Sequence, residues 1–451
     1  MSAPKKPRMA APPVSRVARA GWMILLAMTA WLACAVWNSI KPPPPGTHLA
    51  SLPVRIGESQ IDLIDDGAHP GETLAREVDA AGRAEQTIVL DQSPLPRELA
   101  QQLLARKRQR PNLAVLLVTD PRSAADGGTS AQTLEALERA GIVVSRANLE
   151  RMRDPDPLYS SLWRLTVAWW SNPFDENRRP GGWASGLRRR NLKSDERRLF
   201  VADDGAGGWT SFVSSRADAP GAEGRPGAGM SLEIRGQLAR DIVASETRIA
   251  DWSTHDDRMP AAPPQEGRGI GTIDARYLTE GAIRASLREV LGLAGDGDSI
   301  EVIGPSLEDR DVVIAMGSAA ARGAHLRILL DPVRPGTRAA AGELRRDDAA
   351  HVEIRWQTGA AAAARYALIR HRSDVWLVLG SADFGSDALG DMNLESDVEL
   401  HLPARAAPAR MAEDVFARNW ARAAPYPDHA DESRETYWRY RLAQATGSAL
   451  F

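Results

Sequence analysis

An internal repeat constrains the fold of this chain more than any other feature of its sequence. Each half contains, in the same order, a strand, a helix, a second strand that ends in a turn, a Gly/Ala-rich linker and a further strand. Continuous apolar runs that alternate with helices are typical of buried strands covered by helices. The sequence therefore predicts two tandem α/β halves. The repeated elements are the strands at 86–91 and 299–303, the helices at 96–109 and 309–322, the strands at 113–118 and 325–330, and the strands at 142–145 and 352–356.

A long uncharged segment near the N-terminus predicts one membrane-spanning helix. Residues 20–40 carry no charged side chain, and at about 1.5 Å per residue they can cross a hydrocarbon core about 30 Å thick. Trp22 and Trp37 lie near its ends, where interfacial aromatic side chains are favoured. Five cations precede the segment and only Lys41 follows it closely, so the positive-inside rule predicts a single-pass inner-membrane protein with its bulk in the periplasm. A cleaved secretory signal is the alternative interpretation.

Clusters of proline and glycine indicate where the predicted domains begin and end. Residues 41–46 read Lys-Pro-Pro-Pro-Pro-Gly, a stiff spacer, and prolines and glycines gather again between the halves. The predicted order is a cytoplasmic arm at 1–19, the anchor at 20–40, the Pro-rich spacer at 41–55, the first half at 56–255, a linker at 256–271, and the second half with its closing helices at 272–451.

Composition limits the classes of partner and cofactor. The 56 Lys and Arg residues and 59 Asp and Glu residues give a formal charge of −3, so no global positive field attracts nucleic acid. The single cysteine, Cys34, excludes an internal disulfide framework and a cysteine-based zinc site. No two of the eight histidines have the spacing of a local metal-ligand pair. We therefore predict neither a metal nor a cofactor.

Two segments have the outline of a catalytic loop. Residues 196–203 combine charged side chains, a short apolar run and an acid. The later segment contains Gly380-Ser381-Ala382-Asp383 and is followed by Asn393-Leu394-Glu395. Cations and hydroxyl groups held in this way stabilise negative charge on phosphoryl oxygens.

These segments resemble the two signatures of the phospholipase D superfamily, whose motif reads His-x-Lys-x4-Asp with a trailing Gly-Ser-x-Asn and an acid. The segments at 191–204, 307–332 and 437–447 occur in the family's order, and the chain is similar to membrane-anchored bacterial phospholipase D-like proteins, the group that includes cardiolipin synthase relatives. The resemblance implies two α/β/α halves whose motifs meet at a pseudo-two-fold interface. It also implies phosphodiester chemistry, in which one histidine attacks phosphorus and the other protonates the leaving alkoxide.

In the first half, the motif lacks its histidine. Glu196 stands at the histidine position, Arg198 at the lysine position and Asp203 at the acid. Ser215 fits the trailing serine, although Ala217 replaces the asparagine. An arginine still binds phosphate, in a bidentate way.

In the second half, two registers of the motif are open. One places Arg365 on the histidine and Ala367 on the lysine. A register one residue earlier places Ala364, Tyr366 and His371 on the histidine, the lysine and the acid. Neither restores the motif.

The trailing segment of the second half is better matched. Ser381 and Glu395 fit the family pattern, while Asp383 replaces the asparagine and adds negative charge. The phosphate-binding candidates are therefore Arg198, Ser215, Ser381, Asp383 and Glu395, and no catalytic residue is assigned.

The missing imidazoles lead to three classes of function. Imidazole is nucleophilic near pH 7 and its protonated form returns the proton, which neither a carboxylate nor a guanidinium does. The sequence favours a catalytically degenerate pseudoenzyme that binds a phosphate-bearing ligand, such as a phospholipid, or a partner protein. The alternatives are an active phospholipase or phosphatidyltransferase with a variant site, and a structural partner of an active paralogue. If the first register holds, an ion pair between Glu196 and Arg365 closes the old cleft.

A tryptophan-rich segment at 162–170 carries apolar residues at helical spacing. Two interpretations are open for it: a lipid-binding patch, because indole favours the membrane interface, or rings that fill the core and the seam between the halves.

Overall fold

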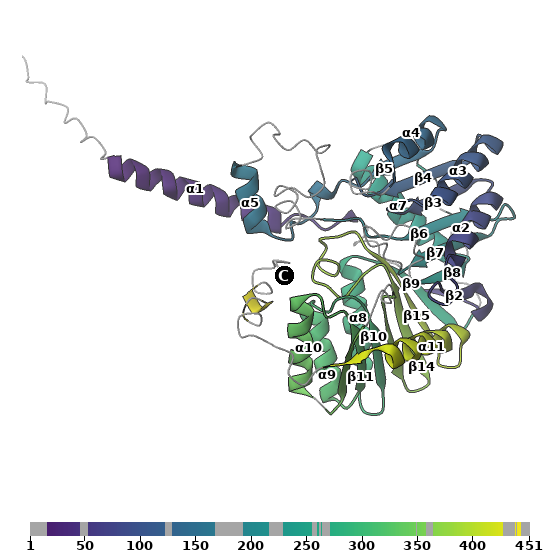
Figure 1. The fold of residues 1–451 in the computed structure, drawn as a ribbon. Coiled ribbons are helices and arrows are strands. Elements are labelled where there is room, and N and C mark those ends of the chain that lie inside the picture. Colours follow the sequence, from purple (N-terminus) through teal and green to yellow (C-terminus); the bar gives the residue numbers. More distant parts are fainter. Residues whose placement is uncertain are drawn as a thin grey trace, which may run out of the picture.

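A computed structural model describes residues 16–45, 53–121, 129–166, 193–215, 229–254, 259–260, 263, 271–348, 350–357, 364–426, 438 and 440–442. Most of the predicted linker at 256–271, Ala217 and residues 167–170 of the tryptophan-rich segment lie outside this part of the chain. The N-terminal helix α1 (Arg16–Ser39) is long and apolar enough over Ala18–Ser39 to cross a membrane, and it projects away from the rest of the molecule (Figure 1).

The first half forms a seven-stranded sheet in the order β2-β8-β7-β6-β3-β4-β5. Its central strands have apolar, buried interiors, as the sequence predicts. The elements are β2 (Ile61–Asp65), α2 (Glu72–Arg83), β3 (Thr87–Asp91), α3 (Arg97–Gln109), β4 (Ala114–Thr119), α4 (Ala131–Arg139), β5 (Val143–Arg146), α5 (Pro157–Thr166), β6 (Leu199–Asp203), β7 (Trp209–Ser214), β8 (Met230–Arg235) and α7 (Leu238–Thr254).

The second half repeats this order in a nine-stranded sheet, β1-β9-β15-β14-β13-β10-β11-β12-β16. Strands β9 to β15 correspond one by one to β2 to β8, which confirms the predicted repeat. The elements are β9 (Ile273–Thr279), α8 (Gly281–Leu293), β10 (Ser299–Ile303), α9 (Arg310–Ala321), β11 (His325–Leu330), α10 (Pro335–Asp347), β12 (Val352–Trp356), β13 (Tyr366–His371), β14 (Asp374–Gly380), β15 (Ser396–Pro403), α11 (Ala407–Arg422) and β16 (Ala424–Pro425).

One boundary differs from the prediction. The spacer was expected to run from 41 to 55, but β1 (Val54–Ile56) pairs with β9 at the edge of the second half's sheet. Ile56 is buried there, because its side chain packs into the core shared by the two halves.

The molecule has three apolar cores, and the central one joins the two halves. Helices α2, α3 and α4 cover the outer face of the first sheet, and α8, α9 and α10 cover the outer face of the second. Helices α7 and α11 contribute to a central core built from both sheets, in which Ile242 and Phe416 are fully buried. The inner sides of the two halves are therefore packed together (Figure 1), and a bridge between Asp195 and Leu394 crosses this junction.

Candidate functional site

Strands β6 and β13 occupy equivalent places in the two sheets, and their registers align the two motifs. Leu199 opens β6 opposite Asp91 and Val213. Tyr366 opens β13 in the same way, opposite the last residue of β10 and opposite Leu379. The residues that precede these strands, Arg198 and Arg365, are therefore counterparts. Neither register considered from the sequence has this alignment.

The mismatch has a simple geometric origin. The hairpin between β6 and β7 has five residues, 204–208, whereas the one between β13 and β14 has two, 372–373. Counting back across the hairpin from the trailing serine therefore differs by one position, because Ser215 follows Arg198 by 17 residues and Ser381 follows Arg365 by 16. On the ladder alignment, the residue two before Arg365 is Ala363, which lies outside the described residues.

The first motif lies directly against the trailing segment of the second half. Asp195 forms an isolated parallel bridge with Leu394, and the Glu196 amide donates to the Leu394 carbonyl over 2.9 Å. The Ser194 amide donates to Oδ1 of Asn393 over 3.0 Å. These backbone contacts hold the half-buried Glu196 beside Glu395, although the two residues are far apart in the sequence.

Glu395 is the buried centre of this site. Only 1% of its surface is exposed, and the Ser381 hydroxyl donates to its Oε2 over 2.5 Å. Burial raises the pKa of Glu395 well above its usual range, and the nearby Glu196 carboxylate raises it further, although the Arg365 guanidinium acts in the opposite direction. This environment therefore favours the protonated form of the Glu395 carboxyl.

The first half has no counterpart of this acid. The Ser381 amide donates to the Ser396 carbonyl, and the Ser215 amide donates in the same way to Met230. The residue that corresponds to Glu395 is then Gly229. Without a carboxylate partner, the Ser215 hydroxyl donates to the Met230 carbonyl over 3.0 Å. The site is consequently one-sided, with its acid in the second half.

Two guanidinium groups accompany these acids. Arg198 is 9% exposed. Arg365 is half-buried and donates from Nη1 to the carbonyl of Ser381, while its Nε has no hydrogen-bond partner. Among the described residues, no ion pair joins Glu196 to Arg365. The hypothesis of a closing ion pair is therefore corrected: both side chains act instead on Glu395.

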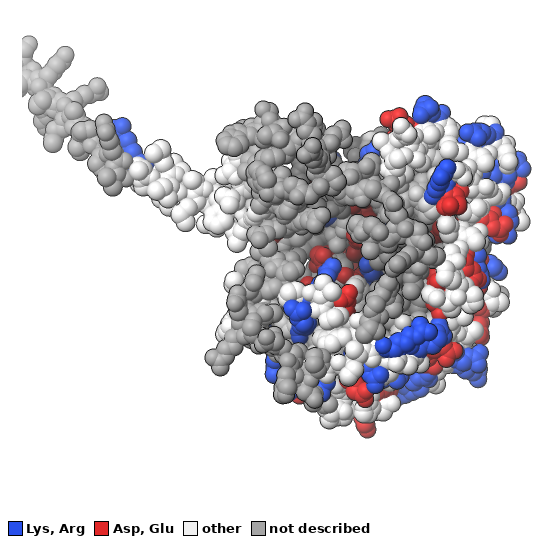
Figure 2. Space-filling view, in the orientation of Figure 1, with Lys and Arg blue, Asp and Glu red and all other residues white. Residues whose placement is uncertain are grey.

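Further carboxylates surround Asp383, which is buried and 3.9 Å from Arg334. Burial raises the pKa of Glu308 to about 7, with Asp383 and Asp387 adding to the effect and Arg334 opposing it. Burial also raises the pKa of Asp397 to about 7. Acidic and basic side chains are visible inside the hollow at the centre of the face in Figure 2.

The other motif positions have structural contacts. Asp203 accepts hydrogen bonds from the amides of Glu85, Gln86 and Thr87, and so fixes the start of β3. Ala367 is buried in the outer core of the second half.

The earlier register gives no reactive group either. Ala364 is buried, and Tyr366 donates its hydroxyl to the Ala412 carbonyl over 2.8 Å. His371 lies at the far end of β13, where its Nδ1 is 2.8 Å from Asp298. His325, His351 and His401 also lie away from Glu395, because they flank the opposite ends of their strands.

Sequence reasoning missed Arg197, the residue between the two motif positions. It is fully buried, with Nη1 2.6 Å from Glu246 and Nη2 2.5 Å from Glu280. Asp195 lies in the same cluster, and burial raises the pKa of Asp195 and of neighbouring Asp91 well above their usual range. Successive side chains of an extended segment point to opposite sides. This pattern could have predicted that Arg197 points away from the side of Glu196 and Arg198.

The comparisons with known proteins agree with this arrangement. A family model described as "Cardiolipin synthase, PLD-like domain" matches residues 287–420. A search of curated proteins finds no match. The crystal structure of phosphatidylserine synthase from Haemophilus influenzae Rd KW20 is similar over 92% of this chain and 99% of that chain, with a TM-score of 0.59 at 10% sequence identity.

Two further solved structures are similar over smaller parts. Polyphosphate kinase from Porphyromonas gingivalis has a TM-score of 0.49 at 12% identity, over 86% of this chain and 53% of that chain. Nuc from Salmonella typhimurium, a phospholipase D family member, has a TM-score of 0.29 at 18% identity, over 34% of this chain and 99% of that chain. The family match and the shared fold lead to one conclusion: residues 287–420 form a domain of the cardiolipin synthase, PLD-like family, within a chain that has the fold of that phosphatidylserine synthase.

Proposed function

We propose that this protein is a membrane-anchored phospholipase D-like protein that has lost phosphodiester chemistry and binds a phosphate-bearing ligand. The observation that carries the proposal is the alignment of Arg198 with Arg365 in the two ladders. On that alignment, a cation occupies the lysine position of both motifs. The histidine positions hold Glu196 and Ala363.

Loss of the chemistry follows from the side chains at the histidine positions. Glu196 is a carboxylate whose charge repels a phosphodiester, and Ala363 has no functional group. Removing the nucleophile of a catalytic unit lowers the rate roughly 10⁶-fold. Here both imidazoles are absent.

Retention of phosphate binding follows from the arginines. A guanidinium presents a rigid fork of donors that suits phosphate, and Arg365 has an Nε without a partner. Ser381, by contrast, uses its hydroxyl on Glu395, so we assign it to the support of the site. With the helix α1 as anchor, the ligand that we propose is a phospholipid headgroup, met in the inner membrane from the periplasmic side.

The Glu196–Glu395 pair supports a second candidate, an active hydrolase with a variant site. A buried carboxyl with a raised pKa beside a more exposed carboxyl is the arrangement of many acid–base catalysts. Glu395 is 1% exposed and hydrogen-bonded to Ser381, however, so a ligand does not reach its carboxyl without rearrangement. We therefore rank this candidate below the binding function.

Turnover and binding are tested on the full chain. Reconstituted in phosphatidylethanolamine vesicles with fluorescent phosphatidylglycerol, it should release no product and carry no covalent phosphoryl group. In detergent, it should bind dihexanoyl-phosphatidylglycerol, as measured by calorimetry. Arg198→Gln and Arg365→Gln should each weaken this binding by about 10- to 100-fold, the value of a charged hydrogen bond.

Controls distinguish the candidates. Arg365→Lys keeps the charge and should weaken binding less than Arg365→Gln, while Arg235→Gln, on the exposed end of β8, should leave it unchanged. Lipid turnover that is abolished by Glu196→Gln would establish the second candidate instead. Wild-type affinity in both arginine-to-glutamine variants would contradict the phosphate site and leave the structural-partner alternative.

A further inference from the structure

Helix α5 has the reverse of the polarity expected in water. Its serines, Ser160 and Ser161, are buried, whereas Leu158, Leu162 and Leu165 are 40%, 50% and 41% exposed. The leucines are spaced by four and three residues, so they form one apolar stripe. A helix on a soluble protein turns such a stripe toward the core and its polar face outward.

The buried polar face of α5 contacts a charged cluster below it. Ser160 donates to Oδ2 of Asp154 over 2.6 Å, and Arg164 reaches back along the helix to the same carboxylate. Lys193 and Lys41 lie 2.7 and 3.6 Å from Oδ1 of Asp154. Burial acts to raise the pKa of Asp154, but the hydrogen bonds from Arg164 and Lys193 outweigh it and lower the pKa to about 2. The cluster fixes the orientation of α5 with its leucines outward.

Helix α5 also contacts the membrane anchor. The Trp31 indole donates from Nε1 to the Leu158 carbonyl over 2.8 Å, and the Asp154 amide donates to the Asn38 carbonyl. In Figure 1, α5 crosses α1 near the end that joins the globular part. The exposed leucines are therefore continuous with the apolar surface of α1, on which Leu32 and Val36 are also exposed.

The hydrogen bond between Trp31 and Leu158 determines how deep α5 lies in the membrane. Trp31 precedes the last residue of α1, Ser39, by eight residues, which is about 12 Å along a helix. One leaflet of the hydrocarbon core is about 15 Å thick. If α1 spans the bilayer up to Ser39, the start of α5 lies among acyl chains and not in water.

We propose that α5 is a second membrane-embedded element, which lies in the leaflet nearer the globular part and places Leu158, Leu162 and Leu165 against lipid acyl chains. The proposal rests on the membrane anchoring by α1 proposed above. Lys193, held by Asp154, lies three residues before Glu196, so embedding α5 also fixes the candidate site relative to the membrane surface.

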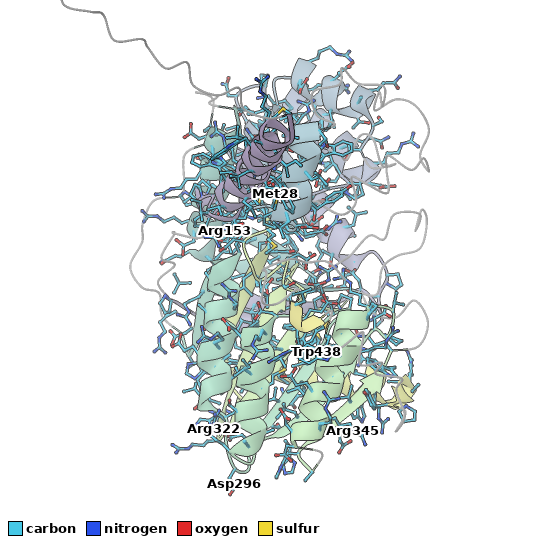
Figure 3. The ribbon with its side chains drawn as sticks, turned by 90° about the vertical axis from the view of Figure 1, so that its left-hand side faces the viewer. Met28, Arg153, Asp296, Arg322, Arg345 and Trp438 are labelled. Atoms are coloured by element: carbon cyan, nitrogen blue, oxygen red, sulfur yellow. The ribbon has the colours of Figure 1, made fainter. Side chains whose placement is uncertain are left out.

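Labelling of single cysteines tests the depth. In a Cys34→Ser background of the full chain, Leu162→Cys is labelled with a nitrobenzoxadiazole fluorophore and reconstituted in phosphatidylethanolamine–phosphatidylglycerol vesicles. Leu293→Cys is the matched control: this leucine is 45% exposed, and it lies beside Arg322, at the end of the molecule opposite Met28 (Figure 3). Leu25→Cys, on α1, reports anchoring itself.

The proposal expects doxyl-labelled lipid to quench the label at 162, with iodide quenching about fivefold or more weaker than at 293. Aqueous iodide should quench the label at 293 fully and doxyl lipid should not. If the label at 25 lies in lipid but the label at 162 lies in water, α5 is not embedded, and the proposal is overturned while the anchor stands. Labels at both 25 and 162 in water would overturn the anchoring proposal and, with it, this inference.

Discussion

At the scale of single residues, positions 195–198 alternate between two environments. Asp195 and Arg197 are buried in the junction between the halves, whereas Glu196 is half-buried beside Glu395. One short segment therefore supplies both an internal charge cluster and the candidate site. The alternation explains how Arg197 can be fully buried next to two residues of the motif.

The carboxyl of Asp397 makes stability depend on pH. Its pKa is about 7 in the folded protein, against an ordinary value near 3.8, so the folded state binds the proton more tightly. The stability that the folded state gains from this tighter proton binding is fully present below about pH 4 and is lost as the pH rises through 7. The asparagine of the Asp397→Asn variant is neutral at every pH. The free energy of unfolding of this variant should therefore exceed that of the wild type by about 1 to 4 kcal/mol at pH 8, and by little at pH 4.

Urea unfolding of the full chain in detergent at pH 4, 6 and 8 measures this difference. Glu135→Gln, an exposed change on α4, is the control and should give a constant difference at the three values. A constant difference for Asp397→Asn as well would show that its carboxyl is ionised throughout. The pKa of Glu308 is also about 7, so the free energy of unfolding of the Asp397→Asn variant should still fall somewhat as the pH rises.

At the scale of elements, the end of β14 depends on glycine. A Cβ atom at Gly380 would overlap the Ser396 carbonyl and the Asp397 side chain on β15. The close approach lets Ser381 donate to Glu395 and lets Asp397 accept from the Ala382 amide. The site therefore requires a strand pair without a side chain at this position.

Substituting this glycine should destabilise the protein. Gly380→Ala should lower the free energy of unfolding by about 1 to 3 kcal/mol or more, the usual effect of overpacking. Gly292→Ala, in the last turn of α8 with open space around its Cβ, should raise it by about 0.5 to 1 kcal/mol. Thermal unfolding followed by circular dichroism compares the two, and equal effects would contradict the close approach of β14 and β15.

At the scale of the whole molecule, apolar and ionic contacts join the halves. The central core contains side chains from both sheets, and Arg197 of the first half pairs with Glu280 of the second. Glu246 on α7 completes the cluster. All three side chains are fully buried, so water does not screen the attraction between the arginine and the two carboxyl groups.

Breaking this cluster should cost far more than breaking a surface pair. Arg197→Met leaves two buried carboxyl groups without their cation and should destabilise the protein by about 3 to 5 kcal/mol. The loss should shrink at acidic pH, because burial raises the pKa of Glu280 and so favours its neutral form. Arg235→Met removes an exposed guanidinium from Glu233, which keeps its pair with Arg76, and should cost less than about 1 kcal/mol. Chemical unfolding at pH 8 and pH 5 tests both, and equal costs would argue against a shared charge cluster.

Much of the fold was predictable from local patterns. The strands 299–303, 325–330 and 352–356 coincide with β10, β11 and β12, because short apolar runs between turn residues determine them locally. The uncharged segment predicted the helix α1 by length alone. The candidate site was predicted less well: Glu196, Ser381 and Glu395 were named, but their contacts join segments about 200 residues apart.

The sequence by itself determined the repeat, the apolar N-terminal helix and the absence of histidine from the first motif, since each depends on residue type and local spacing. Only the tertiary structure decided that Arg365 aligns with Arg198, that Glu395 shares its site with Glu196, and that α5 exposes leucine while burying serine. The physical reason is that hairpin length, strand register and the neighbour on a helix face are fixed by pairing between distant segments. Those pairings set which side chains share a low-dielectric environment, and no local pattern records them.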